Sequence, residues 1–410
     1  MQKVLLISPV KGRDEAGGDR TYTHVLEENA PAGVEYETYD RALDRGTLRL
    51  RGTGRALKDA LQRARSLALS QAITSLSGEA GATAAFKTVA MLRARRRLFW
   101  EPFLFFEVAP NAYDLVHAHI FSARFGPLDC PLVVSCGGPL RHLYLDARGY
   151  APTRVRQLEL ADALLARALG VDATSSFLPR ASQLYSFTQS GADELRGARL
   201  LPPENVSYVP FHLPTPAPPT ARGDKPFRVG FVAREFRLKG GPRLLRAWDD
   251  VRRWRPDARL HIVGSPPPSP ETLRKLGENG IEWTPFIPRE ELLNEVMPRF
   301  DAFAYPTHYD YLPCYTLLEV MARGVPVAGS DHRDMDAALG ALPGEREGRA
   351  GLLSPTHNTA ALARNILRLL DPQENPRFRA GARAHFEATF SSEAVLPQLS
   401  AVYERACNAS

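Results

Sequence analysis

The chain has 410 residues, which is too long for one ordinary hydrophobic core and favours two domains. A composition of 44% hydrophobic and 24% charged residues is typical of a folded soluble protein and excludes a largely disordered chain. The net charge of +6 is concentrated in residues 41–106, where thirteen Lys or Arg accompany four Asp or Glu.

This local basicity would suit a nucleic-acid-binding protein, which remains one alternative class. No helix-turn-helix, zinc-finger, RRM or KH signature accompanies it, so we expect no nucleic-acid partner. The four cysteines are scattered, with no CxxC pair and no histidine at zinc spacing, as expected for reduced thiols in a cytoplasmic protein without a metal site. The amino terminus, MQKVLLISPVKGRDEAGG, ends its apolar run at a glycine-rich loop and not at a signal-peptide cleavage site. The sequence contains no uninterrupted apolar run of about 18 residues, so we expect no membrane-spanning helix.

Strand-like runs in the first half of the chain are KVLLIS, DLVHAH, PLVVSC and QLYSFT. Helix-like segments separate them, including a long one from about 55 to 99, and this alternation predicts an α/β domain with a parallel sheet covered on both faces. Residues 212–226 read HLPTPAPPTARGDKP, and their five prolines prevent a regular helix or central strand. We interpret this segment as the linker between two domains.

A second alternating series follows the linker. Its predicted strands are FRVGFVA, RLHIVG, IEW, DAFAYP and VPVAGS, and its predicted helices cover residues 241–254, a short stretch before 281, 289–297 and the segment that carries Glu319. Helices over 358–370, 376–388 and 393–406 complete the chain. The pattern predicts a second doubly wound unit, with a ligand in a cleft between the carboxyl ends of the two sheets.

Two loops that join a strand to a helix are candidate phosphate sites. In VAREFRLKGG, Arg234 and Lys239 precede Gly240 and Gly241 at a helix amino terminus, where two cations would clamp a diphosphate. The alternative is a pair of solvated loop cations. In KGRDEAGGDR, Gly17 and Gly18 would let the backbone approach a ligand, or they belong to a plain loop.

Histidine and glutamate side chains extend the candidate site. His117 and His119 of DLVHAHIF lie on the same side of a strand end. We assign His119 to the ligand and expect at least one of the two to be structural. Within YTLLEVMAR, Glu319 near the start of an apolar helix would accept hydrogen bonds from a vicinal diol such as ribose. The alternative is an acid that serves only its helix.

Together these features resemble the GT4 family of retaining glycosyltransferases, which have the GT-B fold. The motifs are GG at 17–18, VHAH at 116–119, Arg234 with Lys239, IVG at 262–264, and PTHYD followed by LLEVMARGVPV. The final FSSEAVLPQLSAVYERA resembles the closing helix that packs back on the first domain. The resemblance therefore implies two Rossmann-like doubly wound domains facing across a cleft: an acceptor-side domain of residues 1–212 with 391–410, and a donor-binding domain of residues 213–390.

The resemblance also implies roles for individual residues. Glu319 would bind the nucleotide ribose, Arg234 and Lys239 the diphosphate, and Asp310 the donor-sugar hydroxyls, while His119 would lie near the transferred sugar. Gly17, Gly18, Gly264, Leu317 and Leu318 complete the implied donor site. The family has two glutamates separated by seven residues, and here Asp310 replaces the first one in a loop that is one residue longer.

The implied activity is the metal- and cofactor-independent transfer of a sugar from a UDP- or GDP-linked donor, with retention of configuration, to a saccharide or lipid-linked acceptor. The alternative is a non-catalytic protein that binds a nucleotide or carbohydrate. Residues 91–108, MLRARRRLFWEPFLFFEV, place arginines beside aromatic residues, which suits an anionic membrane surface on the cytoplasmic side. The other interpretation of this segment is a solvated helix followed by a core strand.

Overall fold

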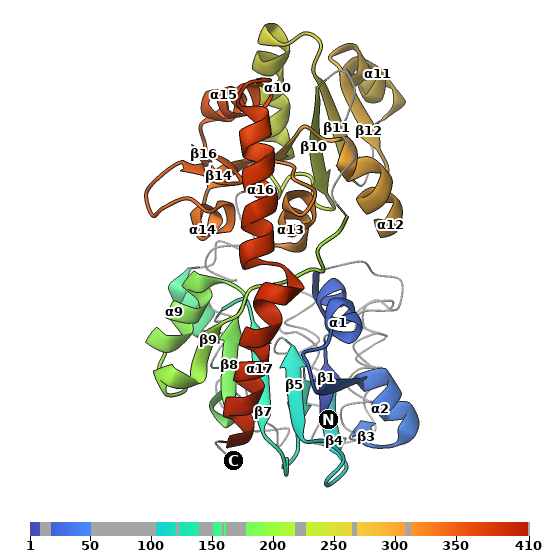
Figure 1. Ribbon diagram of the computed structural model, residues 1–410, viewed down its shortest axis with the longest axis vertical. Coiled ribbons are helices and arrows are strands. Elements are labelled where there is room, and N and C mark those ends of the chain that lie inside the picture. The colour runs from blue at the N-terminus through green and yellow to red at the C-terminus, as the bar shows by residue number, and fades with distance from the viewer. Residues whose placement is uncertain are drawn as a thin grey trace. The chain divides into compact units, whose positions relative to one another are not determined.

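The structure is a computed structural model. It describes residues 1–8, 18–50, 104–119, 123–138, 151–157, 160, 178–217, 227–264, 269–307 and 313–408 (Figure 1). The chain divides into two compact units, Met1–Val209 with Leu396–Ser410, and Pro210–Val395. The sequence-based boundaries lie at residues 212 and 390, within a few residues of these divisions.

Within the described part of the first unit, six parallel strands form a sheet in the order β2-β1-β5-β7-β8-β9. Every residue of β5 and β7 is buried, as expected for central strands with both faces covered. A smaller sheet has the order β3-β4-β6. The strand bounds are β1 Gln2–Ile7, β2 Val34–Thr38, β3 Leu48–Leu50, β4 Leu104–Val108, β5 Leu115–His119, β6 Ala123–Phe125, β7 Leu132–Cys136, β8 Gln183–Ser186 and β9 Val206–Tyr208.

The helical elements of this unit include short and medium segments between the strands: α1 Gly18–Glu28, α2 Tyr39–Arg45, η2 Leu178–Arg180, α9 Gln189–Gly197 and η3 Pro203–Asn205. Thr188 caps α9, because its hydroxyl accepts a hydrogen bond from the Gly191 amide. Apolar residues of β1, β5 and β7 pack with Leu195 of α9 into one core.

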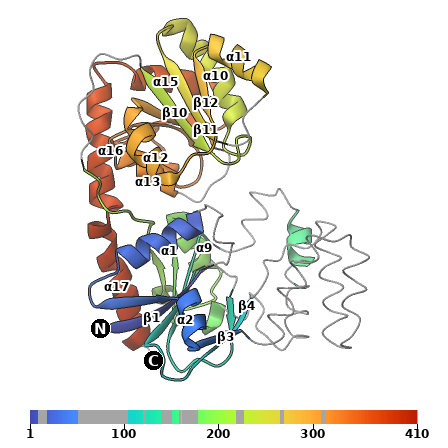
Figure 2. The ribbon, with the colours of Figure 1, turned by 90° about the vertical axis from the view of Figure 1, so that its right-hand side faces the viewer.

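In the described residues of the second unit, seven strands have the order β12-β11-β10-β13-β14-β16-β15, and only the β15–β16 pair is antiparallel. Figure 2 shows β10, β11 and β12 as neighbours. The strand bounds are β10 Arg228–Ala233, β11 Arg259–Gly264, β12 Ile281–Thr284, β13 Ala302–Tyr305, β14 Val327–Asp331, β15 Glu347–Gly348 and β16 Gly351–Pro355.

Helices α10 and α15 pack together on this sheet, because the apolar side of each joins the same buried core as β10 and β11. Trp248 of α10 is fully buried there, and its indole N–H donates to the Asn279 carbonyl. The helical bounds are α10 Gly241–Trp254, α11 Pro270–Glu278, α12 Arg289–Glu291, η4 Leu292–Val296, η5 Met297–Arg299, α13 Tyr315–Met321, α14 Met335–Leu339, α15 Thr359–Leu369, α16 Asn375–Thr389 and α17 Ser392–Asn408.

Two predicted helices deserve comparison with the structure. The single helix expected over 289–297 is wrong in detail: α12 gives way to a π-helical turn, η4, and then to a 3-10 turn, η5, that contains Pro298. Proline has no N–H to donate, so it cannot continue the α-helical ladder. The predicted return of the last helix to the first domain is confirmed, since Tyr403 of α17 bonds His117 of β5.

No helix in the described ranges is long and apolar enough to span a bilayer.

Candidate functional site

The loop between β10 and α10 places both predicted cations at the carboxyl ends of neighbouring strands. Arg234 directly follows β10 and is exposed, with its guanidinium carbon 5.8 Å from the centre of the Phe286 ring. The Lys239 Nζ lies 5.9 Å from the ring centre of Tyr305, the last residue of β13. Because β13 pairs with β10, the two side chains share one edge of the sheet.

The adjacent glycines permit this loop to approach β13. Gly240 has a φ of 81°, and a Cβ there would lie 1.9 Å from the Pro306 carbonyl oxygen. A Cβ on Gly241 would meet the Phe236 ring at 2.3 Å. Both positions therefore require glycine for packing. The result is that α10 begins close to the end of β13, with its first amides at the same edge as Arg234 and Lys239.

Gly264 ends β11 and brings a third strand to this edge. A Cβ on Gly264 would lie 2.0 Å from the Ala233 carbonyl oxygen, so the ends of β10 and β11 are in contact only because residue 264 is glycine. Its own carbonyl accepts a hydrogen bond of 3.2 Å from the Trp283 indole N–H. Gly264 thus holds the carboxyl ends of β10 and β11 close together and connects β11 to β12 through Trp283.

Glu319 lies on α13 and is only 6% exposed. Burial raises the pKa of its carboxyl above the ordinary value, and the Arg289 guanidinium opposes that rise. Arg289 donates from Nη2 and Nε to Glu319 Oε1, at 2.6 and 3.1 Å. The neighbouring Leu317 and Leu318 side chains are fully buried. The Leu318 amide donates to the Cys314 carbonyl.

Arg289 was not found by sequence reasoning, because nothing in the sequence pairs it with an acid thirty residues away. The short connection from β12 to α12 carries both Phe286, near Arg234, and Arg289, bonded to Glu319. Residues 286–289 therefore contact both the loop that carries Arg234 and the helix α13 that carries Glu319. Arg234, Lys239 and Glu319, selected separately from the sequence, all lie in the second unit, and residues 286 and 289 contact Arg234 and Glu319 respectively.

The histidines of β5 lie in the first unit and are both buried. His117 is hydrogen-bonded through Nε2 to the Ser135 hydroxyl at 2.9 Å and through Nδ1 to the Tyr403 hydroxyl at 2.8 Å. Burial lowers the pKa of His117 well below its ordinary value, so this is a neutral structural histidine. His119 Nδ1 lies 3.0 Å from the same Ser135 hydroxyl, and its ring lies 4.4 Å from that of Tyr22.

Three predicted features fall wholly or partly outside the described residues. Gly17 and Asp310 lie outside them, and Gly18 is the first residue of α1. Of the basic aromatic segment 91–108, only the last five residues are described, and these form β4. Phe106 in β4 is fully buried, as the core-strand interpretation requires at this position.

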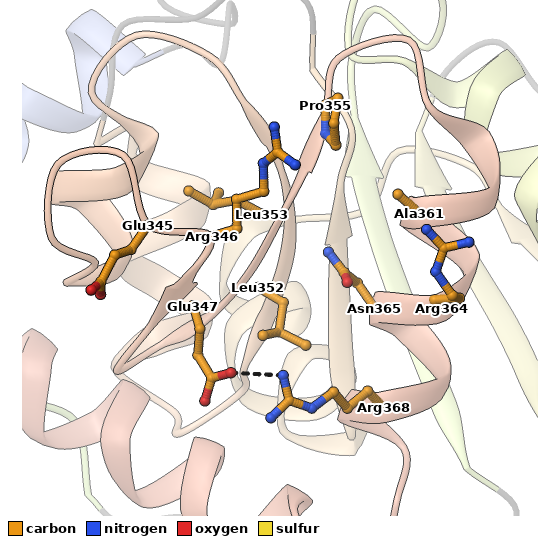
Figure 3. Close-up of a pocket in the computed structure, with 10 residues that line it drawn as sticks. All are labelled: Glu345, Arg346, Glu347, Leu352, Leu353, Pro355, Ala361, Arg364, Asn365 and Arg368. Atoms are coloured by element: carbon orange, nitrogen blue, oxygen red, sulfur yellow. Dashed lines mark hydrogen bonds and ion pairs between the residues drawn. The ribbon is translucent and has the colours of Figure 1, made fainter.

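An open cavity of about 470 Å³ lies in the second unit, between the β15–β16 hairpin and α15 (Figure 3). Its charged groups are largely paired: the Glu347 carboxylate binds Arg368 at 2.7 Å and Arg377 at 2.8 Å. None of the predicted donor residues lines it. The lining residues are Glu345, Arg346, Glu347, Leu352, Leu353, Pro355, Ala361, Arg364, Asn365 and Arg368.

Comparison with known proteins gives matches in sequence and in structure. Residues 226–372 match the family model described as "Glycosyl transferases group 1". The chain is 28% identical over 311 residues to the D-inositol 3-phosphate glycosyltransferase of Streptomyces scabiei, a match that covers 68% of this chain and 65% of that relative. The chain thus spans about two thirds of that relative's length.

Two solved structures match nearly the whole chain. The Anabaena protein HepE in complex with UDP and glucose has a TM-score of 0.59 and 14% identity, with 98% of this chain and 100% of that chain covered. A mutant of S. aureus TarM in complex with Fondaparinux, alpha-GlcNAc-glycerol and UDP has a TM-score of 0.60 and 10% identity, with 98% and 100% covered. At these identities the likeness concerns the fold, and it confirms the predicted GT-B architecture.

Proposed function

We propose that this GT4-like chain, whose residues 226–372 match the group 1 glycosyl transferases, is a glycosyltransferase. It would bind a nucleoside diphosphate sugar at the edge of the second sheet and transfer the sugar, with retention of configuration, to a saccharide or lipid-linked acceptor. UDP is the first nucleotide to test, because the similar HepE and TarM structures contain it. GDP is the second.

One observation carries this proposal. Two exposed or half-buried cations, Arg234 and Lys239, lie beside the amino terminus of α10, and the connection after β12 joins them to the Arg289–Glu319 pair. A diphosphate is bound by fixed cations and helix amides, and a ribose diol by a carboxylate. These groups are chemically complementary to the two halves of a nucleoside diphosphate, the diphosphate and the ribose.

The chemistry would need little acid or base from the protein. Cleavage of the bond between the sugar and the diphosphate develops negative charge on the leaving phosphate, which Arg234 and Lys239 would stabilise. In front-face retention the departing phosphate takes the proton of the acceptor hydroxyl, so no enzymic nucleophile is required. Asp310 would then contact donor-sugar hydroxyls, and His119 would lie near the transferred sugar.

We test the clamp by substituting each cation. Arg234→Ala and Lys239→Ala should each weaken UDP binding by about 1 to 3 kcal/mol, the cost of one lost charge-assisted contact. Isothermal titration calorimetry on the purified full chain measures the change. Arg237→Ala is the matched control, because Arg237 is an exposed cation of the same loop. If Arg237→Ala weakens binding as much as the other two, general charge attraction explains the result and the clamp is wrong.

Turnover separates the proposed enzyme from a non-catalytic binding protein. We expect release of UDP when the chain is incubated with UDP-sugars and an acceptor panel that includes D-inositol 3-phosphate and lipid-linked saccharides. The first is included because a relative is named for it. Stable binding of a UDP-sugar without release of UDP across that panel would favour the binding protein.

Flotation with anionic vesicles tests a peripheral location on the cytoplasmic face of a membrane, expected from residues 91–108.

A further inference from the structure

Glu319 is an acid in an environment that disfavours its charge. Its neighbours on α13, Leu318 and Val320, are fully buried, and Glu319 itself is 6% exposed. Removing a carboxylate from water costs several kcal/mol unless a partner offsets the loss. The carboxylate therefore depends on the groups that touch it.

Arg289 is the side chain bonded to this carboxylate, and the geometry is one-sided. Both of its donors, Nη2 and Nε, reach Oε1, whereas neither of these two bonds involves Oε2. Arg323, one turn further along, bonds the Glu319 backbone carbonyl at 2.9 Å and the Leu293 carbonyl at 2.6 Å. Arg323 thus connects α13 to η4, and among the residues that the structure describes Arg289 is the one that donates hydrogen bonds to the Glu319 carboxylate.

The position of Arg289 allows its guanidinium to bond the buried carboxylate while it stays partly exposed to water. It is the first residue of α12, after Pro288, and its side chain is 43% exposed. The guanidinium is therefore partly hydrated while the carboxylate is not, so the cation bears little desolvation cost of its own. An arginine fits this role better than a lysine, because its planar fork places two donors on one oxygen.

We propose that Arg289 is a positioning residue that keeps Glu319 ionised and leaves Oε2 to accept hydrogen bonds from the ribose hydroxyls of a nucleoside diphosphate. This inference rests on the proposed function. Arg289 does not itself touch the reacting atoms. Its effect on substrate binding passes through the charge and orientation of Glu319.

The test is the pH dependence of UDP binding to the full chain, measured by calorimetry between pH 6 and 9. Without Arg289, the pKa of the buried Glu319 carboxyl should rise further, so a larger fraction is protonated near neutral pH and ionisation returns as the pH rises. Arg289→Gln should therefore weaken UDP binding about ten-fold near pH 6.5, with the ratio to wild type narrowing towards pH 9. The ratio of variant to wild-type affinity at each pH is compared, because ionisation of UDP affects both proteins equally and cancels in that ratio.

Three further variants make the result specific. Arg289→Gln with Glu319→Gln should bind weakly with a ratio that does not change with pH, because the titrating group is gone. Arg289→Lys keeps a cation beside the carboxylate but loses the two-donor fork, so it should restore part of the UDP binding that Arg289→Gln loses near pH 6.5. Arg299→Gln, which removes an exposed cation from the same segment, should leave binding unchanged.

The outcomes separate this inference from the proposed function. A loss that is constant with pH in Arg289→Gln, or no rescue by Arg289→Lys, would show that Arg289 serves only the fold and would overturn the inference. Thermal unfolding of each variant detects misfolding. If Arg289→Gln does not fold, the pH dependence of UDP binding to Arg289→Lys tests the inference. If wild-type chain binds none of UDP, GDP and ADP, the proposed function itself fails.

Discussion

Gly240 and Gly344 have nearly the same backbone conformation, with φ values of 81° and 85°, but different surroundings. A Cβ at Gly240 would lie 1.9 Å from the Pro306 carbonyl oxygen, whereas nothing lies within 4 Å of a Cβ at Gly344. The pair therefore separates two costs of replacing glycine. One is the left-handed conformation, and the other is the steric clash.

We predict that Gly344→Ala lowers the free energy of unfolding by about 1 kcal/mol, the cost of the left-handed conformation alone. Gly240→Ala should cost at least about 2 kcal/mol more, because backbone atoms at the clash cannot move aside cheaply. Urea unfolding followed by tryptophan emission measures both, since Trp248, Trp254 and Trp283 belong to the second unit. Equal costs would mean that the loop relaxes away from β13.

At the scale of elements, α17 is joined to the first unit through a buried chain of polar groups. The Tyr403 hydroxyl lies 2.8 Å from His117 Nδ1 and 2.8 Å from the Tyr36 hydroxyl. Burial raises the pKa of Tyr403 well above its ordinary value, so the hydroxyl stays protonated and can donate. The helix is thus connected to β5 and β2 by buried polar groups.

Tyr403→Phe should destabilise the chain by about 1 to 3 kcal/mol, because it leaves the buried nitrogen of His117 without this partner. Differential scanning calorimetry detects the change without relying on tryptophan, which reports mainly on the other unit. Glu404→Gln, at the adjacent exposed position of α17, is the control and should change little. An unchanged unfolding temperature for Tyr403→Phe would show that apolar packing alone holds α17.

The elements that were predictable from sequence share a physical property. KVLLIS contains four consecutive apolar residues, and in RLHIVG only His261 interrupts the apolar run; these segments form the largely buried strands β1 and β11. The edge strand β2, VEYET, carries two glutamates, and β16, GLLSP, contains glycine and proline, so neither has a clear strand signal. Contacts with neighbouring strands determine these two.

The same distinction holds for the candidate site. Arg234 and Lys239 precede a glycine pair within one short motif, so local chemistry indicates their role. The bond from Arg289 to Glu319 joins residues thirty positions apart and depends on how α12 and α13 pack. Glu319 was predicted to rely on a ligand or on the helix dipole, and the structure supplies a protein cation. A local pattern thus finds groups that share a loop and misses those joined by tertiary packing.

For the whole molecule, buried histidines should make stability depend on pH. Burial lowers the pKa of His212 to about 4, and it also lowers the pKa values of His117, His261 and His385. Below about pH 6.5 the unfolded chain binds protons at these imidazoles while the folded chain does not. Stability therefore falls as the pH drops from about 6.5 towards 4. Glu319 contributes in the opposite direction, because its pKa is raised in the folded chain and folding is therefore weakened as the pH rises through that pKa.

His212, which is 1% exposed and hydrogen-bonded through Nδ1 to the Ser392 hydroxyl, should contribute most clearly. A depression from 6.5 to about 4 corresponds to about 3 kcal/mol lost across this interval. Urea unfolding at pH 5, 6, 7 and 8, followed by tryptophan emission, should show stability rising with pH below about 6.5. His212→Gln should reduce the slope of unfolding free energy against pH by up to about one proton in this range. A slope unaffected by His212→Gln would mean that the folded state accommodates a charged imidazole at this position.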